Sequence, residues 1–433
     1  MRSLSLILPV GSLFCTVLGC GHGQPGIHTI TTPRIGPWRA VLQLDAASIP
    51  FLFQLDSAAG GWEWVVMNGA ERIAVHDVTV RRDSMFVHMP LFDSSIKCRI
   101  EHDSLLVGEW CNNLKGPDYR IPFQARAGKA PRFAHATTEA ADLSGTWETH
   151  FSPGKEDAYD ALGMFEQHGD LLTGTFGTET GDYRFLEGVV REDSLFLSCF
   201  DGSHAFLFRA ELRNDTLVGH FWSGSHWEEP WHAVRNDSFA LRDQDSLTFL
   251  KEGYDMVDFR FPSIDGGQLS PKDERFTGKP LMVQIMGSWC PNCVDETRLL
   301  NEVYGRYHDQ GLEVLAVAFE KYEQYERAIA ALREFRDELG VEYPITYAGL
   351  ASKSVAAEKL PFLDHVMSFP TTLFIDRLGK VRRIRTGFYG PGTGEHYAIY
   401  KRNLNHFLER LLSEAPPQQV AQGSSSLMST ATR

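Results

Sequence analysis

The residues of this chain whose types and spacing could support chemistry are two cysteines, Cys290 and Cys293, in the stretch GSWCPNC. They follow the apolar run Leu281–Met286, which is typical of a strand buried on both faces. The segment Val294–Tyr307 comes next and has the spacing of a helix. Two thiols at such a strand-to-helix junction are compatible with a redox dithiol, half of a metal site, a peroxidase centre, or two inert buried cysteines.

The start of a helix favours redox chemistry at Cys290. A helix N-terminus directs partial positive charge and free N–H groups at a sulfur placed there, and the thiolate is the reactive form. We therefore expect Cys290 to be exposed and nucleophilic, and Cys293, one turn further on, to be more buried but within bonding distance. Cys290 would attack a client disulfide and Cys293 would resolve the mixed disulfide, whereas the reverse sequence would oxidise a client.

The other kinds of site fit the sequence less well. A zinc site needs a second Cys/His pair at suitable spacing, and the sequence of this region has none. A peroxidase centre requires Pro-x-x-x-Thr/Ser-x-x-Cys, but Gly287 and Val283 occupy those positions before Cys290, and Cys290 and Met286 occupy them before Cys293. We therefore predict no metal site and no bound cofactor.

Strands and helices alternate around the cysteine pair from about Leu247 onwards. After the first helix, the hydrophobic patterning predicts a buried strand at 312–320, a charged amphipathic helix at 323–339, a hairpin of strands at 371–376 and 380–388, and a helix at 397–412. This order indicates an α/β or α+β fold with helices on both faces of a sheet.

The stretch GSWCPNCVDET resembles the redox motif of the TlpA/ResA-like branch of the thioredoxin superfamily, the redoxins. The resemblance extends over about 160 residues and includes DFRFPSIDGG, YPITYAG, SFPTTLFID and GPGTGEHY. It implies a thioredoxin-like fold and thiol–disulfide exchange through Trp289, Cys290 and Cys293. It also implies that Pro370 is cis and faces the cysteine pair. Trp289 has a simpler alternative role, which is to cover the disulfide by packing.

The same resemblance implies supporting residues. Phe369 would offer its backbone to a bound peptide, and Glu296 occupies a position where an acid tunes the thiol pKa in some members of the family. Gln284 stands where thioredoxins keep a buried acid, which leaves Glu296 as the better base; a solvated acid on the first helical turn is its alternative role. The dipeptide Pro291-Asn292 contributes to the reduction potential and matches neither extreme of the family.

Residues 35–235 contain an internal repeat. GPW at 36–38 recurs as GTW at 145–147, VRRDSMF at 80–86 as VREDSLF at 190–196, and HDSLLVGEW at 102–110 as NDTLVGHFW at 214–222. The nearly constant offset indicates a duplication. Each copy has short alternating strands between Asp-Ser or Asp-Thr turns, which predicts a small antiparallel barrel or sandwich and faintly resembles lipocalin-like barrels. The aromatic segment His220–Trp231 could line a binding mouth or fill the interior of its barrel.

The N-terminal stretch MRSLSLILPVGSLFCTVLGC has the layout of a secretory signal. Its ending resembles a bacterial lipoprotein box, which implies that Cys20 carries a lipid and becomes the mature N-terminus. Three further cysteines lie in the repeats. Cys98 and Cys111 flank an expected hairpin turn at His102-Asp103 without lying opposite each other, so a bridge between them is not favoured, and Cys199 is expected to be a buried thiol.

Length and charge limit the functions that the chain can have. With 433 residues it needs two to four domains, and its net charge of −14 argues against nucleic acid as a partner. We expect two tandem antiparallel β-barrel or sandwich modules followed by an α/β thioredoxin-like fold. The predicted division is a signal peptide at 1–20, a tether at 21–34, β modules at 35–128 and 140–236, a thioredoxin-like domain at 247–413, and a disordered tail at 414–433.

These features together predict a bacterial envelope thiol–disulfide oxidoreductase that is lipid-anchored and faces the periplasm. It would reduce disulfides of client proteins through the Cys-Pro-Asn-Cys motif and receive electrons from a thiol protein of the envelope. The alternative is an envelope ligand-binding or scaffold lipoprotein in which the β modules carry the main function and the redox domain is accessory.

Overall fold

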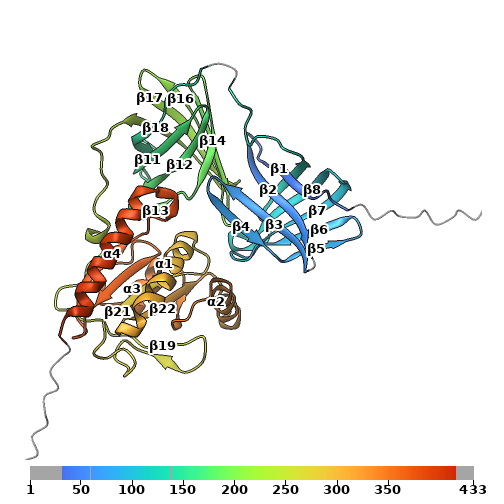
Figure 1. Cartoon of the computed structure of the whole chain (residues 1–433). Coiled ribbons are helices and arrows are strands. Elements are labelled where there is room, and N and C mark those ends of the chain that lie inside the picture. Colours follow the sequence, from blue (N-terminus) through green and yellow to red (C-terminus); the bar gives the residue numbers. More distant parts are fainter. Residues whose placement is uncertain (1–31, 59, 137–138, 416–433) are drawn as a thin grey trace, which may run out of the picture.

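The computed structural model describes residues 32–58, 60–136 and 139–415, which form two β structures and a C-terminal α/β domain (Figure 1). The predicted signal segment with Cys20, most of the tether and nearly all of the predicted tail lie outside the described residues. Within the described ranges, no helix is both long and apolar enough to cross a membrane.

The first sheet has nine antiparallel strands in the order β4-β3-β2-β1-β9-β8-β7-β6-β5. Alternate side chains of its strands are buried, as the period-2 pattern requires, and Trp64 stacks on Phe53 inside the sheet. Its strands are β1 (Gly36–Gln43), β2 (Ser48–Ala58), β3 (Gly61–Asn68), β4 (Glu71–Val75), β5 (Val78–Arg81), β6 (Ser84–His88), β7 (Ser94–His102), β8 (Leu105–Asn112) and β9 (Arg120–Ala127).

The second sheet closes on itself, and we call it the barrel. Its order is β11-β10-β18-β17-β16-β15-β14-β12-β13, and an additional pairing of β11 with β12 completes the ring. Its interior is filled by aromatic side chains, among them Phe151, Phe208 and Trp231. Its strands are β10 (Gly145–Phe151), β11 (Tyr159–His168), β12 (Leu171–Thr178), β13 (Gly181–Asp182), β14 (Leu186–Arg191), β15 (Ser194–Phe200), β16 (Ala205–Arg213), β17 (Thr216–Ser223) and β18 (Trp227–Arg235).

The predicted coarse architecture, barrel-like β sheets followed by a thioredoxin-like domain, is confirmed. Its division into two duplicated modules stays a prediction. Between β7 and β8 the register pairs Cys98 with Gly108 and Cys111 with Ser95, and both thiols are free. The pairing shifts the expected hairpin turn by one residue, because His102 pairs with Leu105. Cys199 is a buried free thiol, as expected.

The C-terminal domain has a five-stranded sheet in the order β23-β22-β21-β24-β25, with β21, β22 and β23 parallel. Its elements are β21 (Leu281–Met286), α1 (Pro291–Tyr307), β22 (Glu313–Glu320), α2 (Tyr325–Leu339), β23 (Ile345–Leu350), α3 (Lys353–Lys359), β24 (Thr371–Ile375), β25 (Val381–Thr386) and α4 (Glu395–Ser413), and a small hairpin, β19 (Phe261–Pro262) with β20 (Gln268–Leu269), precedes them. The predicted strands and long helices are present. The sequence patterning gave no separate expectation for β23 and the short α3, which are too brief for a clear period.

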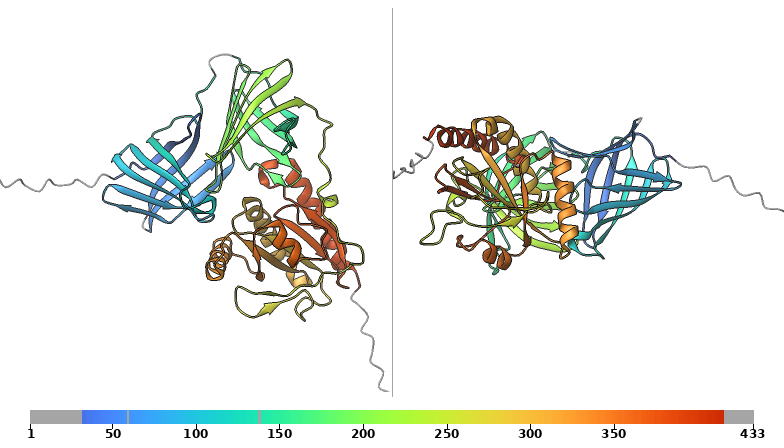
Figure 2. Two further views of the ribbon diagram at one scale, coloured as in Figure 1. Left: turned by 180° about the vertical axis from the view of Figure 1, so that it is seen from behind. Right: turned by 90° about the horizontal axis from the view of Figure 1, so that it is seen from below.

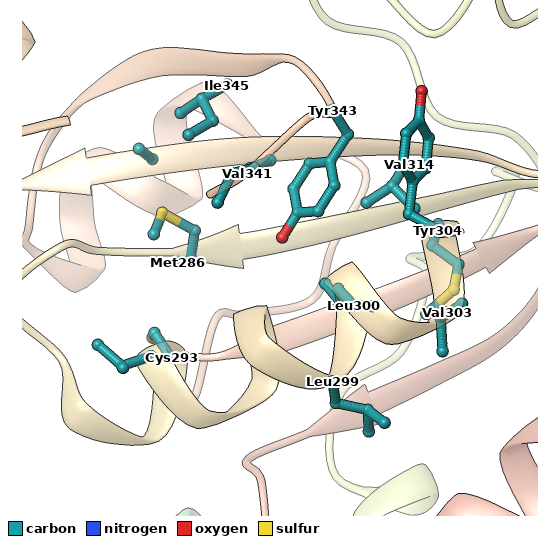
Figure 3. Close-up of a cluster of buried hydrophobic side chains, with 14 of the residues drawn as sticks. Met286, Cys293, Leu299, Leu300, Val303, Tyr304, Val314, Val341, Tyr343 and Ile345 are labelled. Carbon is teal, nitrogen blue, oxygen red and sulfur yellow. The ribbon is translucent and has the colours of Figure 1, made fainter. Parts of the chain in front are cut away.

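Two cores cover the two faces of this sheet. One contains buried side chains of α1, α2 and α4, and the other contains Ala356 of α3 with the chain segment that precedes β21. Figure 3 shows the first core, with Cys293 at the beginning of α1 near Met286 and with Leu299 and Leu300 further along the helix. The cysteine pair is therefore held between a fully buried strand and a helix packed on that strand.

The three parts of the chain meet at one buried arginine, Arg184 of the barrel. Its guanidinium pairs with Glu71 of the first sheet at 2.5 Å, with Asp201 of the barrel at 3.5 Å, and with Asp295 of α1. Burial by itself would lower the pKa of Arg184, but these carboxylates raise it well above its usual value, so the group stays charged. We call these four residues the Arg184 cluster.

Other contacts support the same arrangement. Phe51 of the first sheet stacks on Phe200 of the barrel with ring centroids 4.3 Å apart. Helix α2 lies against the first sheet (Figure 2), where Arg327 donates to Asp93 at 2.5 Å. The two β structures and the C-terminal domain therefore pack on one another through apolar and charged contacts.

We expect Arg184→Ala to destabilise the protein by about 3–5 kcal/mol, because it leaves three buried carboxylates without their shared cation. The measurement is the urea midpoint of unfolding followed by intrinsic fluorescence. Arg213→Ala is the matched control, since the pair of Arg213 with Glu211 is exposed and its loss should leave the midpoint nearly unchanged. Equal midpoints for the two variants would contradict a dominant role of the Arg184 cluster.

Candidate active site

Cys290 is the N-cap residue of α1. Its backbone is extended, with φ −106° and ψ 112°, and its Sγ accepts a hydrogen bond from the backbone N–H of Cys293 at 3.3 Å. Pro291 follows at the first helical position, where a missing N–H has no cost. The two sulfurs are not joined by a disulfide in this structure. The sulfur of Cys290 thus lies at the positive end of the helix, as the sequence predicts.

The burial of the pair differs in part from expectation. Cys293 is fully buried, and burial raises the pKa of its thiol well above the usual value, assisted by its contact with Cys290. Cys290 is only 6% exposed, so the prediction that it is an exposed thiol is wrong. Cys290 nevertheless lines a cavity together with Trp289, Phe369 and residues at one end of the barrel.

The peptide bond between Phe369 and Pro370 is cis, as the family resemblance implies. The carbonyl oxygen of Phe369 accepts a hydrogen bond from the Cys290 thiol at 3.4 Å. The indole of Trp289 contacts the Phe369 ring edge-on at 5.6 Å and donates its Nε1–H to the Phe319 carbonyl at 2.9 Å. The structure therefore brings Trp289, Cys290, Phe369 and Pro370 together around one sulfur.

Glu296 is buried beneath the pair. Its two oxygens accept hydrogen bonds from Gln284 Nε2 and from Thr372 Oγ1, both at 2.9 Å. Burial raises the pKa of this carboxyl to about 7, and its negative charge contributes to the raised pKa of Cys293. The alternative of a solvated first-turn acid is therefore wrong. A carboxyl that titrates near neutral pH beside a buried thiol is suited to proton transfer.

Lys321 is a neighbour of Cys290 that sequence reasoning missed. Its Nζ lies 4.5 Å from the centroid of the Trp289 ring, and burial lowers its pKa while the negative charges of Cys290 and Glu320 oppose that shift. Lys321 directly follows β22, which is parallel to β21, so the position at the shared carboxyl edge was the signal that could have identified it.

Two residues of the barrel, Arg184 and Gly181, reach the active-site helix, and Asp182 reaches the segment that precedes α4. Arg184 Nη1 donates to the Pro291 carbonyl at 3.4 Å, and Asp182 accepts from the backbone N–H of Gly390 at 2.5 Å. Gly181 approaches Asn292 so closely that a Cβ added to Gly181 would lie 1.9 Å from the side-chain amide nitrogen, Nδ2, of Asn292. The residues that make these contacts are more than 100 positions apart in the sequence, and no sequence pattern predicts the contacts. In the described part of the chain, no group of three His, Cys, Asp or Glu side chains could hold a metal ion.

Residues 253–384 match the AhpC/TSA family. The thioredoxin-like protein YneN of Bacillus subtilis is 28% identical over 138 residues, which is 32% of this chain and 73% of that protein. The thiol-disulfide oxidoreductase ResA of Geobacillus thermodenitrificans is 29% identical over 140 residues, covering 32% and 72% of the two chains. The C-terminal domain is a TlpA/ResA-like redoxin.

Solved structures match the redoxin domain as well. A crystal structure of a putative thiol:disulfide interchange protein DsbE from Chlorobium tepidum has 21% identity and a TM-score of 0.30, covering 38% of this chain and 99% of that one. The predicted enzyme class, a thioredoxin-like thiol–disulfide oxidoreductase, is confirmed by the relatives of the redoxin domain.

In the redoxin domain, we expect Glu296→Gln to remove a pH-dependent increase in turnover. The carboxyl is deprotonated above its pKa of about 7, so wild-type turnover should rise as the pH increases through that value. The variant should lose this rise and turn over about 100-fold more slowly above pH 7. Disulfide reductase assays from pH 5 to pH 9 measure the profile.

Glu302→Gln is the matched control for this experiment, because Glu302 lies on the same helix but pairs with Lys401 at the surface. It should keep the wild-type profile. An unchanged inflection near pH 7 in Glu296→Gln would assign that titration to another group and refute the role of Glu296.

Proposed function

We propose that this chain is an envelope thiol–disulfide oxidoreductase that reduces disulfides of client proteins through Cys290 and Cys293. The observation that carries the proposal is the N-cap position of Cys290, whose sulfur lines a cavity while Cys293 lies buried behind it. A nucleophilic thiol must meet a client from outside, and a resolving thiol must reach only its partner, so the arrangement suits these two roles.

The reaction follows from this geometry. The Cys290 thiolate attacks one sulfur of the client disulfide, and the client S–S bond breaks. The attacked sulfur stays bound to Cys290 in a mixed disulfide, and the other client sulfur leaves as a thiolate. Glu296 then takes up the proton of Cys293, and the Cys293 thiolate attacks the Cys290 sulfur. The mixed disulfide breaks, the second client thiolate leaves, and a Cys290–Cys293 disulfide remains. Two electrons have passed to the client, and a dithiol protein of the envelope restores them to the pair.

The proposal also includes the cellular location of the protein. The signal-like first 20 residues and the lipobox cysteine Cys20 support export and attachment to a membrane through lipid, with the redoxin domain facing the periplasm. The alternative, a ligand-binding scaffold with an accessory redox domain, is less well supported. The large cavity of the barrel is shared with Cys290, which favours one combined function over two separate ones.

We expect Cys290→Ser to abolish reductase activity in an insulin reduction assay, because serine cannot form a mixed disulfide. Cys293→Ala should accumulate mixed disulfides with clients, visible as higher-mass species on non-reducing gels and removed by dithiothreitol. Cys111→Ser, in the first sheet, is the control and should retain full activity. Wild-type protein without any disulfide exchange would refute the enzyme proposal, and a reduction potential near −120 mV would refute the reductase direction.

We expect Cys20→Ser to move the protein from the membrane fraction to the soluble fraction of the cell, because it removes the atom that would carry the lipid. The measurement is immunoblotting after fractionation, with Cys15→Ser in the same leader as the control. Unchanged partition of the Cys20 variant would refute the lipid anchor without affecting the redox proposal.

A further inference from the structure

The open end of the barrel and the redox centre line one open cavity of about 1040 Å³. On the redoxin side it is lined by Trp289, Cys290 and Phe369, and on the barrel side by Tyr159, Tyr183 and Glu229, among others. A cavity of this volume can hold a peptide segment and is larger than a single small group needs. A client that reaches Cys290 therefore also meets the interior of the barrel.

Glu229 is the unusual group in this cavity. It lies on β18 with its side chain turned inward, and it is only 1% exposed. One carboxylate oxygen accepts from Ser152 Oγ at 2.6 Å and the other accepts from the Tyr159 hydroxyl at 2.8 Å. The Tyr159 hydroxyl is also 2.5 Å from that of Tyr183. A carboxylate can accept about four hydrogen bonds, so this one retains unused acceptor positions.

Among the residues that the structure describes, no Lys, Arg or His nitrogen lies within 4.0 Å of Glu229. The cations of the cavity are engaged elsewhere. Arg242 binds Glu179 through two hydrogen bonds, Lys115 lies 3.2 Å from His226, and Lys321 lies over Trp289. A buried carboxylate without a cation is costly, and a cation supplied by a ligand would relieve that cost.

The walls around Glu229 suit the stem of a long basic side chain. Phe206, Phe221 and the ring of Tyr183 lie within 5.5 Å of one another, measured between ring centroids, and line the same end of the barrel. Aromatic faces attract ammonium and guanidinium groups and accept the methylene stems of Lys and Arg. Apolar walls with one buried acid at the end are the arrangement that a cationic side chain requires.

We propose that the open end of the barrel is a side-chain pocket that selects clients with a Lys or Arg near the cysteine that Cys290 attacks. This inference rests on the proposed function, since the pocket acts on the substrate of the same redox centre. The basic side chain would enter between the aromatic rings and donate to Glu229, while the client backbone passes Phe369 and its disulfide meets Cys290.

The test uses the full-length protein with an intramolecularly disulfide-bonded peptide whose reduction releases a quenched fluorophore. One Lys is placed at each position from one to four residues on either side of the reactive cysteine, and matched peptides carry Gln or Glu there. At the best position we expect kcat/KM for the Lys peptide to exceed that for the Gln peptide at least tenfold, and the Glu peptide to be slowest. Equal rates for Lys and Gln peptides at every position would overturn the inference.

The variant Glu229→Gln should reduce the ratio of Lys to Gln peptide rates to about one, because the amide lacks the charge. Glu228→Gln is the matched control, since Glu228 is exposed, accepts from Trp222 and does not line the cavity, and it should keep the wild-type ratio. A ratio that persists in Glu229→Gln would overturn the inference.

A second measurement needs no variant and covers the case in which Glu229→Gln does not fold. Peptides without cysteine that carry Lys should inhibit wild-type reduction of insulin more strongly than their Gln counterparts, and equal inhibition would count against the pocket. Loss of reduction for all disulfide peptides would refute the proposed function itself, which is a different result from reduction without preference.

Discussion

The arrangement of this molecule depends on one buried guanidinium. Arg184 has a carboxylate from the first sheet, one from the barrel and one from the redoxin helix around it, and it also donates to the backbone of that helix. Removing Arg184 would leave these three buried carboxylates without their shared cation. Because one guanidinium pairs with carboxylates from all three parts of the chain, the orientation of the barrel over the cysteine pair has little freedom to change.

That orientation changes the surroundings of the cysteine pair. In a redoxin domain alone, the sulfur at a helix N-terminus would face solvent, whereas here Cys290 lines a cavity shared with the barrel and is only 6% exposed. Residues of the barrel and charges such as Lys321 line the same cavity as the sulfur. The barrel is therefore part of the environment in which the sulfur reacts.

Local sequence patterns and the family resemblance predicted most of the redoxin domain, apart from β23 and α3. Leu281–Met286 and the CxxC after it predicted the strand-to-helix junction, and the family resemblance implied that Pro370 is cis. Long-range contacts were not predictable. Nothing near Arg184 or Glu229 in the sequence distinguishes them from surface charges, because their burial arises from segments that meet only after folding. The same effect made the prediction of an exposed Cys290 wrong.

The close approach of Gly181 to Asn292 has a wider meaning. The dipeptide between two redox cysteines influences how readily they accept electrons, and here one of its residues is touched by a different part of the chain. The electrochemical character of the pair is then a property of the whole assembly. The isolated redoxin domain would therefore have a different reduction potential. Any strain or movement transmitted through the barrel would likewise change the reduction potential of the pair.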